Sequence, residues 1–306
     1  MIREYAIEPQ LVAELGDPRD FRFAVAAFGL GQPRVMAEYP KLKNWRRQVL
    51  EGVDTSRALD AQRVVELVKV LSERMAGRLT GTYDGTQRWL DNALREHGLE
   101  PFAAILARAN PTGDAAVIDW EHVSAGDPKW DAPRACVVQR RAGDMAGAVA
   151  GMLGACSAAI FVDPHFAPEM PKFRRPFGEF MVALRRRRNR EPPARVEIQL
   201  AVKSTAEFFE SECKGRLAEL IPAGWRVRLV RLRNLDAGAE LHNRYILTDL
   251  GGVTFGHGLD DGGPGEDDDV TLMDKAQYLH RWEQYGGSRP GFSIAEEPVD
   301  VVGTRR

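Results

Sequence analysis

The stretch ELHNRYILTDLGGVTFGHGLDD, Glu240 to Asp261, carries the pattern that decides the fold. Apolar residues occur in both halves of this stretch, and the pair Gly251-Gly252 lies between them. Paired glycines are typical of two-residue hairpin turns, because such turns require positive φ angles. The sequence therefore predicts a β-hairpin with strands at 241–249 and 253–257.

Three side chains of this hairpin are expected on one face. His242 and Arg244 are two residues apart, so they project from the same side of their strand, about 7 Å from each other. With the turn at the glycines, Ile246 pairs with His257, and directly paired residues share a face. His257 therefore joins this face. Asp249 has the opposite parity and lies at the exit of the strand, where it is expected to hold the turn or orient a neighbour.

The shared face combines groups that suit phosphodiester chemistry. An imidazole such as that of His242 can attack phosphorus and leave a covalent intermediate. A fixed cation such as Arg244 can hold the non-bridging oxygens while charge develops on them. Neither step requires a metal, and the three cysteines form no C-x-x-C pair that would suggest a thiolate zinc site. We expect no metal and no cofactor.

Strands and helices alternate through the rest of the C-terminal half, residues 136–306. The predicted strands are 158–163, 195–202 and 225–232, and the predicted helices are 145–156, 177–188 and 205–220. Helices of this length between strands imply crossover connections. We therefore predict an α/β domain with a largely parallel sheet that ends in antiparallel strands.

Residues 1–135 are predicted to form a smaller α+β domain. The predicted elements are a helix after Asp54-Thr55-Ser56, a helix from Asp84 or Thr86 to a C-cap at Gly98, and a strand at 114–120. The turn-rich segment Ser124 to Pro133 marks the domain boundary. This domain is expected to sense or dock, through contact with a partner protein.

Composition and charge limit the partners. The chain has 306 residues, 44% hydrophobic and 28% charged, which is enough for two folded units. Its formal net charge is −2, so nucleic acid would have to bind through local basic patches. The densest run, Arg185, Arg186, Arg187 and Arg188, is a candidate nucleic-acid contact or a solvated helix end. A second basic run surrounds Trp45, whose indole offers a stacking surface unless that run too is only solvated.

The location of the protein is read from its first residues and its cysteines. The start MIREYAIEPQ has charges where a signal peptide needs an apolar core, and no apolar run approaches the roughly 18 residues of a membrane span. An odd count of three cysteines fits a reducing compartment. We expect a cytoplasmic protein without membrane contact.

The run from His242 through Arg244 and Asp249 to Gly256 resembles the H-x-K-x4-D-x6-G signature of the phospholipase D-like superfamily. The segment IFVDPHF, Ile160 to Phe166, is similar to the strand ending in Asp-Pro-Tyr near the start of such domains. The order of strands and helices between the two segments is similar as well, so the resemblance covers roughly residues 145–285.

The resemblance implies a mixed sheet flanked by helices and a catalytic set of His242, Arg244 and Asp249. In this family one motif histidine, here His242, attacks phosphorus, while the histidine of a second motif protonates the leaving group. The motif cation, here Arg244, binds the phosphate. No other histidine of the chain is followed two residues later by Lys or Arg. The second motif is therefore expected from another copy, in a twofold homodimer with His242 facing the axis.

Two positions depart from the family pattern. Arg244 replaces the lysine, and its planar guanidinium can grip a phosphate bidentately but is not interchangeable with an ammonium group. After Gly256 the family usually has Ser and Asn, whereas this chain has His257-Gly258-Leu259-Asp260. His257 is therefore expected to bind the substrate in their place, next to Gly256.

Residues outside the hairpin are further candidates for the site. Asp163 ends a predicted strand at the edge where ligands gather in α/β folds, although strand-end acids are common. His165 either orients His242, contacts the substrate, or is simply packed in a turn. The acidic segment 260–269 is predicted to be a solvated loop, or one that gates the site or docks a basic partner. Its spacing lacks the pattern of a calcium loop.

Together these residues predict a metal-independent phosphodiesterase, a nuclease that forms a phosphohistidine at a homodimeric site. Lipid hydrolysis is disfavoured, because nothing resembles a membrane-binding amphipathic surface. One phospholipase D-like motif joined to an N-terminal module is similar to effectors of bacterial anti-phage defence systems. The alternative, favoured by Arg244 and by the altered segment after Gly256, is a non-catalytic module that dimerises and binds nucleic acid or a partner protein.

Overall fold

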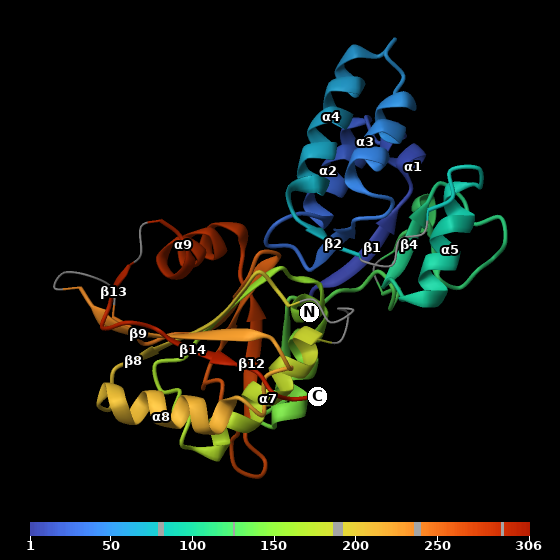
Figure 1. Ribbon diagram of the computed structural model, residues 1–306. Helices are drawn as coiled ribbons and strands as arrows, with labels where there is room; N and C mark the ends of the chain where they lie inside the picture. The colour runs from blue at the N-terminus through green and yellow to red at the C-terminus, as the bar shows by residue number, and fades with distance from the viewer. Residues whose placement is uncertain (79–82, 125, 186–191, 236–239, 289–290) are drawn as a thin grey trace. The chain divides into compact units, whose positions relative to one another are not determined.

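The computed structural model describes residues 1–306 except 79–82, 125, 186–191, 236–239 and 289–290 (Figure 1). The chain divides into two compact units, Ile2–Pro133 and Arg134–Arg306, and Met1 belongs to the second. The division lies at the end of the turn-rich segment 124–133. Each helix in the described part of the chain is too short or too polar to cross a bilayer.

The first unit is built on a five-stranded sheet in the order β3-β2-β1-β4-β5, counted over the described residues. Its strands are β1 (Arg3–Ile7), β2 (Arg34–Ala37), β3 (Met75–Ala76), β4 (Ala104–Ala107) and β5 (Val117–Asp119). Every neighbouring pair runs parallel, so the unit is α/β and the expected α+β class is wrong. The strands after β1 have at most four residues and are largely buried on both faces, which leaves no alternation to read from the sequence.

Helices cover both faces of this sheet. They are α1 (Pro9–Glu14), α2 (Pro18–Ala27), α3 (Leu42–Glu51), α4 (Ala58–Glu73) and α5 (Trp89–Leu99). Tyr5 and Ile7 of β1 share one core with residues of α1 to α4, whereas Ala6 packs with Trp89 of α5. Because successive side chains of a strand alternate between faces, α5 covers the face opposite the other helices.

Both helices expected in this unit exist, with different starts. Helix α4 begins at Ala58, close to the expected position. Helix α5 begins only at Trp89, and Gly98 lies inside it rather than capping it. Asp84 stays in the preceding loop, where its carboxylate accepts hydrogen bonds from the backbone N–H and hydroxyl of Thr86. The expected strand at 114–120 is the shorter β5.

A buried ion cluster joins β1 to α5. Arg78, 3% exposed, lies 2.8 Å from the carboxylate of Glu4 and 3.1 Å from that of Glu96. Its guanidinium also lies over the ring of Phe102, 3.9 Å from the centroid. Buried charges are stable only when they are paired. The stability of each of these three charged side chains therefore depends on the other two.

The second unit is a nine-stranded mixed sheet in the order β13-β9-β8-β7-β10-β11-β12-β6, with β14 also on β9, among the described residues. The strands are β6 (Ala135–Gln139), β7 (Ala158–Val162), β8 (Arg195–Ala201), β9 (Arg226–Asn234), β10 (Arg244–Thr248), β11 (Gly251–Phe255), β12 (Asp267–Leu272), β13 (Phe292–Ile294) and β14 (Val299–Val302). Only β7, β8 and β9 run parallel to one another. The unit is α/β, but the expectation of a largely parallel sheet is wrong.

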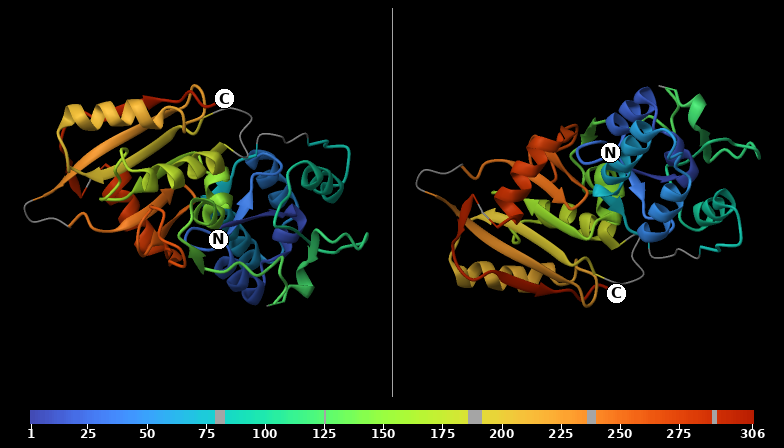
Figure 2. Two further views of the ribbon diagram at one scale, coloured as in Figure 1. Left: turned by 90° about the horizontal axis from the view of Figure 1, so that it is seen from below. Right: turned by 90° about the horizontal axis from the view of Figure 1, so that it is seen from above.

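Four helices flank this sheet in the described residues: α6 (Ala142–Ala155), α7 (Pro171–Arg185), α8 (Ala206–Leu217) and α9 (Lys275–Gly286). Helices α8 and α9 lie on opposite faces (Figure 1, Figure 2). Phe180 of α7 stacks on Phe161 of β7 and meets Phe255 of β11 edge-on, so α7 covers the middle of the sheet. On the other face Tyr285 of α9 meets Tyr245 of β10.

Candidate active site at one edge of the second sheet

The β10–β11 hairpin turns two residues earlier than the glycines predict. Thr248 pairs with Gly251, so the turn is Asp249-Leu250. Gly252 serves packing instead, because a Cβ there would lie 2.8 Å from the side chain of Leu247. A shift of two residues preserves which side chains share a face. The pairing ends at Arg244 and Phe255, so His242 and His257 lie just outside the paired strands.

The antiparallel neighbours β7, β10, β11 and β12 bring several chain segments to one edge. Strand β7 ends, β10 begins, β11 ends and β12 begins at this edge. Tyr245 pairs with Val162, so Arg244 follows next to Asp163 in the same register. This edge collects the candidates Asp163, His165, Arg244 and His257 from segments far apart in the sequence.

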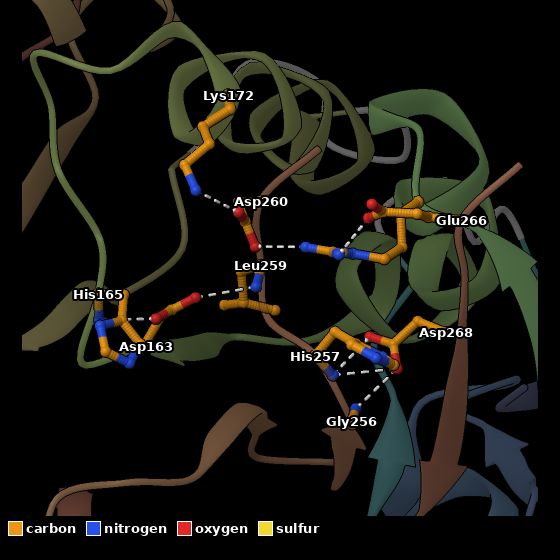
Figure 3. A network of polar contacts seen from close by, with 10 residues as sticks. Asp163, His165, Lys172, Gly256, His257, Leu259, Asp260, Glu266 and Asp268 are labelled. Atoms are coloured by element: carbon orange, nitrogen blue, oxygen red, sulfur yellow. Dashed lines mark hydrogen bonds and ion pairs between the residues drawn. The ribbon is translucent and has the colours of Figure 1, made fainter. Parts of the chain in front are cut away.

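Asp163 is held inside the edge as a buried carboxylate. It is 1% exposed and accepts backbone hydrogen bonds from Leu259 and from His165, each 2.8 Å long (Figure 3). Burial raises the pKa of Asp163, although these hydrogen bonds and the nearby charge of Arg244 act in the opposite direction. Asp163 therefore holds the chain at Leu259 and at His165 in place around the site.

His165 lies beside a lysine. The ammonium group of Lys203 is within hydrogen-bonding distance of His165 Nδ1. Burial lowers the pKa of His165, and the charge of Lys203 lowers it further. An ammonium group can donate only to an unprotonated ring nitrogen, so in this contact Nδ1 of His165 accepts and leaves Nε2–H as a donor. His165 can thus be packed in the turn and still contact a substrate.

Arg244 is a half-buried cation without a carboxylate partner in the described part of the chain. No ion pair of its guanidinium falls within 4.0 Å there, and its buried Nε has no hydrogen-bond partner. Its charge is felt at Asp163 and at His165. An unpaired guanidinium with its stem buried is prepared for a bidentate anion such as a phosphate.

His257 is backed by a buried carboxylate, Asp268, that sequence reasoning missed. The imidazole of His257 is 65% exposed while Asp268 is 1% exposed, and His257 Nδ1 lies 3.3 Å from Asp268 Oδ1. The same oxygen accepts hydrogen bonds from the backbone N–H of Gly256 (2.9 Å) and of His257 (3.1 Å) (Figure 3). A carboxylate on Nδ1 fixes the ring and directs Nε2 to solvent. Gly256 is required here, since a Cβ would lie 2.8 Å from Asp268 Oδ1.

The acidic segment 260–269 is the expected solvated loop only in its middle, because residues 263–266 are exposed and lie outside the strands, whereas Asp260 is buried and β12 begins at Asp267. Asp260 is 8% exposed and is paired with Arg140 and with Lys172, each at 2.9 Å. The residues from Asp267 onward form β12, whose side chains alternate between exposed and buried. Because the residues at the start of this strand are all acidic, the sequence does not show the alternation. That alternation is the signal that would have identified Asp268.

The remaining candidates make none of these contacts. His242 is exposed and precedes β10, with no hydrogen bond or ion pair to another described residue. Arg185 ends α7, while Arg186, Arg187 and Arg188 lie outside the described residues. Trp45 cannot stack on bases as expected, because it is fully buried and its indole N–H donates to the carbonyl of residue 7.

Asp249 ties the hairpin turn to the start of β7, at the end of β10 opposite Arg244. Its carboxylate accepts hydrogen bonds from Ser157 N (2.8 Å), Ser157 Oγ (2.8 Å) and Ala158 N (3.1 Å). The structure does not bring Asp249 to the edge that holds the other candidates. These contacts agree with the expected role in holding the turn.

Replacing Asp249 by alanine is expected to lower the free energy of unfolding of the second unit by about 1–3 kcal/mol, because it removes the hydrogen bonds that the N–H groups of 157 and 158 donate to a charged carboxylate. Chemical denaturation measures this change. Asp269→Ala, at an exposed position of β12, is the matched control and should change stability by under about 0.5 kcal/mol. Equal losses in the two variants would contradict the role of Asp249 in holding the turn.

In the described part of the chain, no group of three or more histidine, cysteine, aspartate or glutamate side chains is arranged to hold a metal ion. Comparison with protein-family models, with curated proteins and with solved structures finds no significant match to this chain. The geometry of the edge is therefore the basis for a functional conclusion. It offers an exposed imidazole, an oriented imidazole and an unpaired cation.

Proposed function

We propose that the second unit is a metal-independent phosphodiesterase of the phospholipase D-like type, acting as a nuclease at this edge. The observation that carries the proposal is the unpaired guanidinium of Arg244 beside Asp163. Arg244 begins one strand of the hairpin, and the other strand leads to His257, whose ring is oriented by Asp268. A cation without a protein partner at a strand end suits an anionic ligand. The imidazoles of His242 and His257 then supply the groups that phosphoryl transfer needs.

The proposed reaction has two steps. His242 attacks phosphorus and forms a phosphohistidine, while the leaving oxygen takes a proton from His242 of a second copy. Water then attacks the phosphohistidine, gives its proton back to the second imidazole, and releases the phosphate ester. Arg244 binds the non-bridging oxygens in both steps, and His257, oriented by Asp268, donates a hydrogen bond to them.

The carboxylates near the edge do not bar an anionic substrate. Asp260 is compensated by Arg140 and Lys172, and Asp261 by Arg175 at 2.6 Å. Burial raises the pKa of Asp163, which makes its carboxyl group easier to protonate. Such pairing removes most of the repulsion that a run of acidic residues would exert on a phosphate. We take nucleic acid as the substrate, with Arg185 as one contact to its backbone.

A second candidate function is a non-catalytic module that dimerises and binds nucleic acid or a partner protein. Arg244 in place of the motif lysine favours it, because a guanidinium holds a phosphate at least as firmly but presents it differently. For both candidate functions, the proposed role of the first unit is to dock with a partner protein or to act as a sensor. A role as an effector of bacterial anti-phage defence is part of the proposal that the second unit is a nuclease.

Cleavage in EDTA separates the two functions. The full chain is incubated with single- and double-stranded DNA and RNA and with a model aryl phosphodiester, each with and without EDTA. The nuclease reading expects cleavage of at least one nucleic acid at the same rate in both conditions. Binding without cleavage of any substrate would establish the non-catalytic module, and cleavage lost in EDTA would exclude the proposed mechanism.

A further inference from the structure

Lys203 is a second exposed cation at the edge of the sheet that holds Arg244. It follows β8 by two residues, and β8 is the neighbour of β7 on the side away from β10. Strands β7 and β8 run parallel and end at the same edge, where the backbone N–H of Ala201 donates to the carbonyl of Pro164 at 3.4 Å. Lys203, Asp163 and Arg244 therefore lie at three consecutive strand ends, in the sheet order β8-β7-β10.

The ammonium group of Lys203 is held in place but not neutralised. It contacts Nδ1 of His165, and both side chains are exposed. Among the described residues, no ion pair of this ammonium group with a carboxylate falls within 4.0 Å. An ammonium group has three donors, so two of them stay available to a ligand that arrives from solvent.

The charges around His165 favour an anionic ligand. Burial lowers the pKa of His165, and so do the charges of Lys203 and Arg244, whereas Asp163 and Asp260 act in the opposite direction. Asp163 is 1% exposed, and Asp260 is paired with two cations. Of these four charged groups, only the two cations are neither buried nor ion-paired within the described part of the chain. The potential that a ligand meets at this edge is therefore positive.

The two cations are spaced for two anionic groups. Strand β7 separates their strands, so the backbones of Lys203 and Arg244 lie about 10 Å apart across the sheet. Arg244 can grip one phosphate bidentately, while Lys203 is held on the far side of β7 by His165. A nucleic-acid strand supplies consecutive phosphates at every nucleotide, whereas a simple aryl phosphodiester carries only one.

We propose that Lys203, positioned by His165, binds the phosphate that neighbours the cleaved one. Its two remaining donors form charge-assisted hydrogen bonds to the oxygens of that phosphate. This subsite rests on the proposed function for the phosphate at Arg244, but binding at Lys203 does not require cleavage. It selects a substrate with two consecutive phosphates, so it favours nucleic acid over an isolated phosphodiester.

Calorimetric titration with thymidine dinucleotides tests the subsite in the full chain carrying His242→Ala, which leaves the ligand intact under the proposed mechanism. One ligand has only the internal phosphate, and two others carry an added phosphate at the 5′ or the 3′ end. The added phosphate at one end is expected to tighten binding by about tenfold. Lys203→Gln should abolish this gain, and Lys203→Arg should keep most of it. Lys214→Gln, whose lysine is ion-paired with Glu210 on α8, is the matched control and should keep the whole gain.

Thermal unfolding shows that each variant is folded before affinities are compared. No binding, equal binding of the three ligands, or an undiminished gain in Lys203→Gln would overturn the subsite. If Lys203→Gln weakens the binding of all three ligands equally, Lys203 holds the cleaved phosphate instead, and the subsite is again overturned. A chain that shows the gain at Lys203 but whose wild type cleaves no nucleic acid would refute the nuclease and support the subsite in a non-catalytic module.

Discussion

Replacing His242 by alanine is expected to lower the rate of phosphodiester cleavage by at least about a thousandfold. The loss should be large because, in the proposed mechanism, the imidazole of His242 forms the covalent bond to phosphorus. Single-turnover cleavage of labelled nucleic acid in EDTA measures it. His280→Ala, on an exposed face of α9, is the matched control and should retain the wild-type rate.

Variants of Arg244 distinguish a role of its positive charge in binding phosphate from a purely structural role of the side chain. Arg244 is half-buried at the start of β10, so Arg244→Lys should preserve the fold and keep a positive charge. Residual cleavage in Arg244→Lys with none in Arg244→Ala would assign the positive charge to the phosphate. Unchanged cleavage in His242→Ala, by contrast, would exclude the proposed nucleophile.

Mixing wild-type and His242→Ala chains tests whether two copies share one site. After subunit exchange between equal amounts of the two chains, roughly a quarter of the dimers carry two His242 imidazoles. The activity should therefore fall to roughly a quarter of that of the same total amount of wild-type protein. A site complete within one chain, with His257 as the proton donor, would keep roughly half. The second result would refute the shared site but leave the nucleophile in place.

The largest effect on stability is expected at Arg78. Arg78→Met removes the cation that faces Glu4 and Glu96, which are 6% and 1% exposed. Breaking a buried ion pair on one side leaves uncompensated charge, so the free energy of unfolding of the first unit should fall by about 3–5 kcal/mol. Chemical denaturation followed by tryptophan fluorescence measures the change.

Arg88→Met is the control for this experiment. Arg88 also pairs with a carboxylate, that of Asp91, but its side chain is 70% exposed. Exposed pairs contribute about 1 kcal/mol or less, so the control should be close to wild type. A loss in Arg78→Met as small as in Arg88→Met would show that the buried cluster is not needed for the fold.

Local patterns of the sequence predicted the central strands and the hairpin well. Strands β7, β8 and β9 lie within about two residues of their predicted bounds, because their apolar residues are continuous in β7 and mostly alternate with polar ones in β8 and β9. The misplaced turn changed the pairing of the hairpin, and His257 lies beyond its last pair, so the shared face of Arg244 and His257 stays a prediction.

Long-range pairing was beyond these patterns. Gln139 pairs with Asp267 across most of the second unit, so neither β6 nor β12 could be placed from neighbouring residues alone. Asp268 as the partner of His257 was hidden for the same reason. Trp45 stands among lysines and arginines, yet the fold buries it, because the helix presents its basic neighbours to the other side.

The carboxylate behind His257 comes from three consecutive aspartates, Asp267, Asp268 and Asp269, which are chemically equivalent. Nothing in their own chemistry selects the middle one. A slip of β12 by one residue would bring another aspartate to the imidazole but would also turn Val270 and Leu272 out of the core. The choice is therefore made by two aliphatic side chains that never touch a substrate, so the register of the strand decides which acid orients His257.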